Sequence, residues 1–397
     1  MSIRRAVYFL ISVIILASCD DIIPSGPAAS EILDGPVDGL TAAENARFLR
    51  GDIAFNDEIF TTTNGLGPLF VATSCGSCHP GDGKGHPFTT LTRFGQSDDT
   101  GNKFLDQGGP QLQNRAIPGH APEFIPLGAT SSKFTPPANT GLGFLAALTD
   151  EQILSHADPH DADGDGISGV PNYINAPEYF RQEWIHQEHN GRYIGRFGKK
   201  AAAVDLMHQT VNAYNQDIGI TSTYNSLDPM TGDYADPEVS DNTVLDVVFY
   251  LRTLKAPIQR DADNAEVIAG KAIFNTVGCN KCHTPEWKTP KSDIAALSEK
   301  TFHPYTDLLL HDMGPGLDDK YTEGSAKTFE WRTPPLWGLG LSGNSQGGGY
   351  YLLHDGRATS INEAIMLHGG EAAQSQEKFS QLGTTEKASL IRFLESL

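Results

Sequence analysis

The pentapeptide Cys-x-x-Cys-His occurs twice in this chain, at residues 75–79 and again at residues 279–283. Two thiols at this spacing match the separation of the two vinyl groups of a porphyrin, and the adjacent imidazole can reach the iron. We therefore expect two covalently bound haem c groups. The expected attachment residues are Cys75, Cys78, Cys279 and Cys282, and the expected proximal iron ligands are His79 and His283.

Two other uses of these cysteines are a shared zinc site and a pair of short disulfides. A zinc site would require both cysteine pairs to converge in space. A disulfide within each pair is compatible with an exported protein. Neither alternative explains why a histidine follows each pair, so the sequence favours haem attachment.

The N-terminus has the pattern of an export signal. The apolar run 7–17 follows two arginines and is shorter than the about 20 residues that cross a bilayer core. Residues 16–19, Leu-Ala-Ser-Cys, resemble the lipobox of bacterial lipoproteins, which implies a lipid on Cys19. An ordinary secretory signal with a chance cysteine is the alternative.

A lipid on Cys19 also accounts for the odd cysteine among the five in the chain, because the other four form the two pairs. The lipid would attach the protein to a membrane. We therefore expect a protein of the cell envelope that is lipid-anchored, either facing the periplasm or on the outer membrane.

Charge excludes one class of partner. The chain has 29 Lys and Arg against 49 Asp and Glu, a formal net charge of −20. Such a field repels phosphate backbones, so no nucleic-acid partner is expected. The 41 glycines and 24 prolines predict many loops. A haem replaces much of the apolar core that a small module otherwise needs, which makes few helices and long loops tolerable.

Local patterns divide the chain into five parts. We expect a lipoprotein signal peptide at 1–18, a tether at 19–43, an N-terminal haem module at 44–140, an intervening region at 141–260 and a C-terminal cytochrome c domain at 261–397. Helical periodicity and caps predict helices over 45–50, 148–157, 240–255, 264–274, 360–368 and 384–397. The predicted fold class is mainly α, with two cytochrome c-like haem modules, long irregular loops and the intervening region.

An aspartate-rich segment at 161–168 matches the start of a calcium loop, with carboxylates at alternate positions and a glycine at the sixth. Position twelve is Asn172 instead of glutamate, and no flanking helix pair is evident, so the segment is not an EF-hand. The alternative is a solvated acidic turn. The expected Ca²⁺ ligands are Asp161, Asp163, Asp165 and the carbonyl of Ile167.

Further segments resemble the bacterial di-haem oxidoreductase family, whose members are described as peroxidases or thiol oxidoreductases. These segments are 65–70, 141–144, 161–172, 195–198, 308–314, 331–337 and 354–357. The family is distantly similar to di-haem cytochrome c peroxidases and to the di-haem enzyme that matures a tryptophan-derived quinone cofactor.

The resemblance implies a second ligand for the second iron. In the similar peroxidases this ligand ends a Leu-x-Glu-Ala-Val-x-x-ligand pattern, and here residues 361–368 read Ile-Asn-Glu-Ala-Ile-Met-Leu-His. His368 therefore takes the place where relatives have Met or Tyr. Met313 and Met366 are the alternatives, although a lone Met is more commonly a packing residue.

Other residues have weaker assignments. No histidine matches the distal position of the first haem, and His86 and His120 are only candidates. We expect His311 and His354 to hydrogen-bond to the protein or to haem propionates. Trp331 and Trp337 could relay electrons, although packing is the commoner role of Trp. Arg332 and Arg357 could pair with propionates or form surface salt bridges.

These observations predict a di-haem c-type oxidoreductase of peroxidase type. Electrons would come from a donor protein or a quinone-linked donor and pass from one haem to a second haem that reduces peroxide or a related oxidant. One alternative is a non-catalytic di-haem electron-transfer lipoprotein. Another is an oxidoreductase that acts on thiols or protein side chains.

Overall fold

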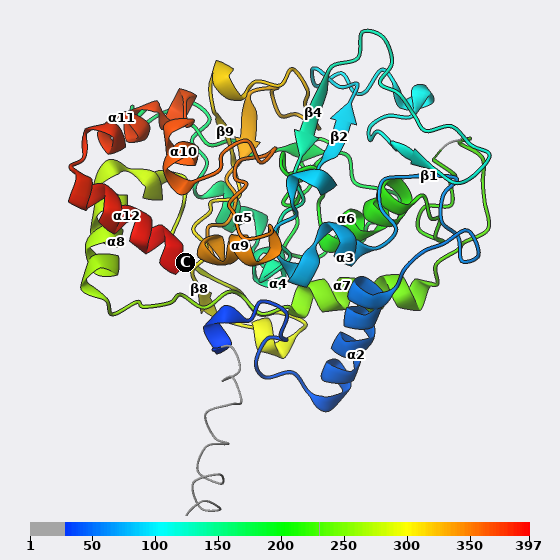
Figure 1. Ribbon diagram of the computed structural model, residues 1–397, viewed down its shortest axis with the longest axis horizontal. Coiled ribbons are helices and arrows are strands. Elements are labelled where there is room, and N and C mark those ends of the chain that lie inside the picture. Colours follow the sequence, from blue (N-terminus) through cyan, green and yellow to red (C-terminus); the bar gives the residue numbers. More distant parts are fainter. Residues whose placement is uncertain (1–27, 230) are drawn as a thin grey trace, which may run out of the picture.

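The computed structural model describes residues 28–229 and 231–397. They form a mixed fold that leans helical and contains small two-stranded sheets (Figure 1). The predicted signal peptide, Cys19 and the first part of the tether lie outside the described residues. Among the described helices, none is both long and apolar enough to cross a membrane.

The elements follow in chain order. The α-helices are α2 Ala42–Asp52, α3 Cys75–Cys78, α4 Leu142–Ala146, α5 Asp150–Leu154, α6 Leu206–Asn212, α7 Asp241–Thr253, α8 Ala265–Val277, α9 Ser342–Ser345, α10 Ile361–Met366, α11 Ala373–Gln381 and α12 Thr384–Ser396. The antiparallel strand pairs are β1 Leu69–Phe70 with β3 Arg115–Ala116, β2 Leu91–Phe94 with β4 Ser131–Phe134, β5 Tyr173–Ile174 with β6 Tyr193–Ile194, β7 Trp287–Lys288 with β8 Thr301–Phe302, and β9 Leu310–Asp312 with β10 Glu330–Arg332.

Helices α8 and α12 pack closely against each other beside the second attachment motif (Figure 1). A glycine makes the approach possible, because a Cβ on Gly270 would lie 2.0 Å from the carbonyl oxygen of Ser389. The rings of Phe274 and Phe393 then meet edge to face, with centroids 5.4 Å apart. Both helices were predicted from the sequence.

Helices α2 and α7 repeat this arrangement beside the first attachment motif (Figure 1). A Cβ on Gly51 would lie 2.2 Å from the carbonyl oxygen of Asp246, and the rings of Phe48 and Tyr250 have centroids 4.9 Å apart. Helix α2 begins at a capping box formed by Thr41 and Glu44. The packing joins the expected N-terminal module to a helix that the sequence division assigns to the intervening region.

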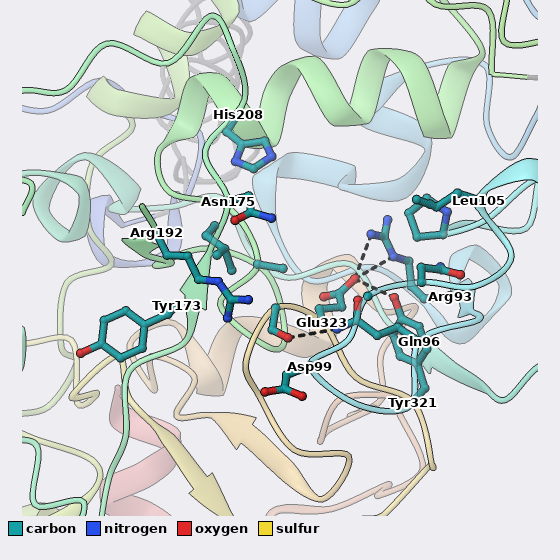
Figure 2. A pocket seen from close by; sticks show the side chains of 16 residues that line it. Arg93, Gln96, Asp99, Leu105, Tyr173, Asn175, Arg192, His208, Tyr321 and Glu323 are labelled. Carbon is teal, nitrogen blue, oxygen red and sulfur yellow. Dashed lines mark hydrogen bonds and ion pairs between the residues drawn. The ribbon is translucent and has the colours of Figure 1, made fainter. Parts of the chain in front are cut away.

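The largest apolar core is also shared between the expected parts. Phe55 comes from the N-terminal part, Leu145 and Leu148 from the intervening region, and Trp337 from the C-terminal part, and all four are buried in one cluster. The three expected parts therefore pack around common side chains. A separate cavity of about 300 Å³ opens between segments that include Arg93, Arg192 and Glu323 (Figure 2).

Candidate functional site

The first attachment motif forms the short helix α3. The hydroxyl of Ser74 accepts a hydrogen bond from the amide of Ser77 at 3.2 Å and so caps this helix. Nδ1 of His79 lies 2.8 Å from the carbonyl oxygen of Pro137. A carbonyl can only accept, so Nδ1 carries the proton and Nε2 is free to bind a metal. Burial lowers the pKa of His79 to about 4, so the imidazole is neutral.

The second motif repeats this geometry. Nδ1 of His283 lies 3.0 Å from the carbonyl oxygen of Tyr305, which again leaves Nε2 free. Burial lowers the pKa of His283 to about 4. Both histidines therefore have the protonation state and orientation that a proximal iron ligand requires.

The four cysteines of the motifs are reduced, with no disulfide among them; Cys78 is buried and the other three are half-buried. Burial raises the pKa of Cys75 and of Cys279 to about 12, so each thiol is protonated. In the described part of the chain, no metal-sized cluster of ligand atoms contains both pairs. This geometry does not fit the zinc alternative, and it leaves two separate thiol pairs.

A group of uncompensated cations tests whether haem fits this space. Burial, together with Lys84 and Arg332, lowers the pKa of Lys199 to about 7 against an opposing attraction from Asp355, and burial lowers the pKa of Lys84 to about 8. Neither ammonium has a hydrogen-bond or ion-pair partner within residues 28–229 and 231–397. Lys199 also acts electrostatically on His79. Both lysines are half-buried. Cations that lose water contacts without gaining a counterion are costly, and haem propionates would supply the missing negative charge.

Arg332, one of the expected propionate partners, lies close enough to Lys199 to lower its pKa and has no ion-pair partner among the described residues. Its Nε donates to the carbonyl oxygen of Gly198 at 2.9 Å and its Nη1 to that of Thr333 at 3.2 Å. Arg357, the other candidate, already pairs with Asp355 at 2.7 Å and with Asp319 at 3.4 Å. The residues present therefore fit a haem with its propionates towards Lys84, Lys199 and Arg332.

His368 follows α10 and lies near the second motif. Its Nδ1 is 2.7 Å from the carbonyl oxygen of Ala364, which leaves Nε2 free. Burial lowers the pKa of His368, and its charge in turn contributes to the lowered pKa of His283. The two imidazoles are thus within electrostatic range. Among the alternatives, Met366 is 40% exposed and Met313 packs against an apolar cluster that contains Trp331.

The candidates for the first haem's distal position lie in loops. The ring of His86 packs against Phe88 and Tyr351, with centroid distances of 4.6 and 4.8 Å. Its Nδ1 accepts a hydrogen bond from the amide of Phe88. His120 is exposed. These contacts give His86 a local packing role.

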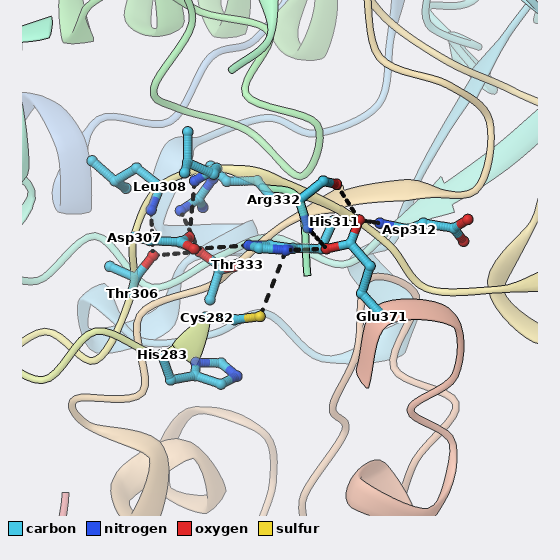
Figure 3. A network of polar contacts seen from close by, with 12 residues as sticks. Cys282, His283, Thr306, Asp307, Leu308, His311, Asp312, Arg332, Thr333 and Glu371 are labelled. Atoms are coloured by element: carbon cyan, nitrogen blue, oxygen red, sulfur yellow. Dashed lines mark hydrogen bonds and ion pairs between the residues drawn. The ribbon is translucent and has the colours of Figure 1, made fainter. Parts of the chain in front are cut away.

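His311 lies at the centre of a buried network beside the second motif (Figure 3). Its Nε2 is 2.7 Å from Asp307 Oδ2, and its Nδ1 is 2.6 Å from Glu371 Oε2 and 3.6 Å from Cys282 Sγ. Although burial alone would lower it, the two carboxylates raise the pKa of His311 well above its ordinary value. The imidazolium is the positive centre between two negative groups.

The aspartate-rich loop differs in part from the expected ligand set. Carboxylate oxygens of Asp158, Asp161 and Asp163 lie within 4.8 Å of one another. Asp165 instead pairs with Lys281 at 2.7 Å. The amide of Ile167 donates to Asp165 Oδ1 at 2.9 Å. Asp158 was not predicted, because it precedes the motif and no spacing signal marks it.

Trp331 is buried between two polar side chains. Lys200 Nζ lies 3.8 Å from the indole centroid, and the His354 ring stacks on the indole at 3.6 Å with an interplanar angle of 11°. These distances place the two groups on opposite faces. His354 also hydrogen-bonds to Asp319 at 2.7 Å. Trp337 lies in the largest apolar core, which is a packing role.

Comparison with known proteins adds an independent finding. No curated protein sequence matches the chain. Among solved structures, hydrazine synthase of Kuenenia stuttgartiensis pressurised with xenon is a distant match, with 15% identity and a TM-score of 0.39; the match covers 95% of this chain and 98% of that one. A MauG-like protein associated with microbial copper homeostasis is another distant match, with 14% identity and a TM-score of 0.33; the match covers 65% of this chain and 89% of that one. A family model described as "Di-haem oxidoreductase, putative peroxidase" matches residues 132–397, which is more than half of the chain. The chain therefore belongs to the di-haem oxidoreductase family, in keeping with its two cysteine–histidine motifs.

Proposed function

We propose that this di-haem oxidoreductase is a c-type, peroxidase-like enzyme. The module of His283 would take electrons from a donor protein or a quinone-linked donor and pass them to the module of His79. Hydrogen peroxide or a related oxidant would be reduced there. Reduction of hydrogen peroxide to two waters consumes two electrons and two protons, which fits a protein with two one-electron centres.

The observation that supports this division of labour is a difference between the two modules. His368 contributes to the lowered pKa of His283, so the second module has a second imidazole nearby that would bind the other face of the iron. The side chain that acts electrostatically on His79 is a lysine, Lys199. Haem propionates beside Lys199 would favour its protonated form, which is no iron ligand, and this favours an open position in the first module.

When bound, each haem would supply an iron that cycles between two oxidation states and that can bind an oxidant wherever a coordination position is open. The chain's own residues would orient it. Cys75, Cys78, Cys279 and Cys282 would form the thioethers, and Nε2 of His79 and of His283 would face the irons. The backbone carbonyls of Pro137 and Tyr305 hold these two rings in register.

The same proposal includes a calcium ion and a lipid anchor. Carboxylates of Asp158, Asp161 and Asp163 would bind the ion, while Asp165 would link the loop to the second motif through Lys281. A lipid on Cys19 and the tether at 19–43 would hold the body at a membrane of the cell envelope.

We further propose that α7 belongs to the first haem module, because it packs on α2 as α12 packs on α8.

An electron paramagnetic resonance spectrum of the oxidised protein tests the function. The proposal predicts one high-spin and one low-spin ferric signal, of which the high-spin signal changes when peroxide is added. Two low-spin signals that do not change when peroxide is added would contradict the proposal and would indicate an electron-transfer protein. Turnover of a thiol in the absence of peroxide would instead support action on thiols.

A further inference from the structure

The cavity of Figure 2 is separate from both haem sites. It has a volume of about 300 Å³, and no attachment cysteine or expected iron ligand lines it. Its walls come from three parts of the chain, 93–110, 173–208 and 321–324, which include residues of β2, β5 and α6 as well as loops. This volume is at the lower end of the range for small-molecule pockets, so only a small ligand would fit.

One part of the wall is neutral because its charges are already paired. Arg93 Nη2 forms a 2.8 Å ion pair with Glu323 Oε1. The hydroxyl of Tyr321 donates to the same oxygen at 3.0 Å, and Arg93 Nη1 donates to Gln216 at 2.7 Å. The charges of Arg93 and Glu323 therefore neutralise each other, and this part of the wall has no net charge that could bind a ligand.

Another part of the wall carries a guanidinium without a partner. Figure 2 shows the side chain of Arg192 directed into the cavity, with no dashed line reaching it. Arg192 is half-buried, and no described residue accepts a hydrogen bond from its guanidinium. Since a guanidinium remains charged at any physiological pH, an anion in the cavity would offset an otherwise unpaired charge.

His208 supplies a second donor at the same cavity. The amide of Val204 donates to its Nδ1 at 3.4 Å, which assigns the remaining proton to Nε2. Burial, with a contribution from Arg93, lowers the pKa of His208 to about 4, so the ring is neutral. No partner for Nε2 is found in the described part of the chain.

We propose that this cavity binds a small molecule through a single carboxylate held by the guanidinium of Arg192, while Nε2–H of His208 donates to another polar atom of the same ligand. A guanidinium offers two parallel N–H groups that match the two oxygens of a carboxylate. Asp99 is exposed at the cavity and has no ion-pair partner among the described residues. It would repel a second carboxylate and attract an ammonium group, which favours an amino acid over a dicarboxylate. The proposal does not depend on the haem reaction.

Calorimetric titration of the full-length, haem-loaded protein tests the site, with L-alanine, succinate and inorganic phosphate as probes. We expect saturable binding of L-alanine and weaker binding of succinate. Arg192→Gln should weaken L-alanine binding by about tenfold or more, since a charge-assisted hydrogen bond is lost. His208→Phe should weaken it by about threefold. Arg181→Gln is the matched control, because Arg181 is exposed, outside the cavity, and donates to the carbonyls of Glu178 and Phe180.

Several outcomes would overturn the assignment. They are the absence of L-alanine binding, affinity that is unchanged in both Arg192→Gln and His208→Phe, and phosphate or succinate binding as tightly as L-alanine. If Arg192→Gln does not fold, His208→Phe and Arg192→Lys provide the same test. The lysine variant keeps the charge but loses the paired N–H groups, so we expect an intermediate affinity.

Discussion

Lys281 Nζ lies 2.7 Å from Asp165 Oδ2, so an ion pair joins the second attachment motif to the aspartate-rich loop. A second connection runs from the same loop through Ser168, whose hydroxyl donates to Glu371 at 2.5 Å, and from Glu371 to His311. His311 in turn lies 3.6 Å from Cys282 Sγ. The loop is therefore in contact with the second haem site at two independent points.

If the loop binds calcium, adding Ca²⁺ to chelator-treated protein should stabilise the fold. The expected gain is about 2.7 kcal/mol when free Ca²⁺ is about 100 times the Kd. Asp161→Asn should reduce the rise in Tm, and Asp158→Asn should do the same because Asp158 joins the cluster. Asp106→Asn, an exposed change outside the loop, is the control. An identical Tm with and without Ca²⁺ would leave the loop as a solvated acidic turn.

Because of His311, we expect the free energy of unfolding to decrease as the pH becomes alkaline. Its folded pKa is raised above the unfolded value, so its contribution is complete below about pH 6.5 and is lost as the pH rises through the folded pKa. His311→Gln should cost about 3 kcal/mol at neutral pH, because two buried carboxylates lose their counterion. Urea unfolding between pH 6 and pH 10 measures both effects, with the exposed His120→Gln as control. A variant as stable as the parent at pH 6 would contradict the assignment.

Lys199→Met should lower the midpoint potential of the first haem, because the variant removes a positive charge that disfavours the ferric state. A unit charge at about 10 Å contributes about 1.7 kcal/mol at an effective dielectric constant of about 20, or about 70 mV for one electron. Spectroelectrochemical titration measures the shift. Lys103→Met, whose ammonium is largely exposed, should leave the potential unchanged. An unchanged potential in Lys199→Met would place this lysine away from the haem.

The close helix crossings provide a test of the two-module arrangement. Gly51→Ala and Gly270→Ala each place a methyl group against a backbone carbonyl that cannot rotate away. The expected loss is about 1–3 kcal/mol from overpacking, which exceeds the gain of about 1 kcal/mol in helix propensity. Gly316→Ala meets no atom within 4 Å and should be neutral in the same urea titration. Equal stability of Gly51→Ala and the parent would argue against tight packing of α2 on α7.

Local signals in the sequence account for the attachment motifs and the helices beside them. The Cys-x-x-Cys-His spacing matches the spacing of the porphyrin vinyl groups. The helical period of apolar residues over 384–397 predicts the helix that the structure has as α12. The same reasoning assigned 240–255 to an intervening region. Its packing on α2 depends on Gly51 meeting Asp246, almost 200 residues away, and no local pattern encodes that contact. The strands were not predicted either, because a two-residue strand such as β1 is too short to show an alternating apolar pattern.

The polar groups around the haem sites were also beyond prediction. Lys84 and Lys199 lie in no motif, and only the folded chain shows that neither ammonium group has an ion-pair partner among the described residues. Glu371 reaches His311 from a segment 60 positions further along the chain. In contrast, His368 was identified because its helix has a family pattern, and the fold places that residue near His283.

The proposed ligation by His368 gives the most direct spectroscopic prediction. Nε2 of His368 is free because Nδ1 faces the carbonyl of Ala364 at 2.7 Å. His368→Ala should therefore convert the second haem from low spin to high spin, and added imidazole should restore the low-spin signal. His368→Met should keep six ligands and raise the midpoint potential, since thioether ligation favours the ferrous state. Met366→Ala is the matched control, because Met366 is 40% exposed on the same segment. A low-spin spectrum of His368→Ala without imidazole would mean that another side chain binds the second face of the iron. The same measurement on Met313→Ala would then show whether the thioether of Met313 is that ligand.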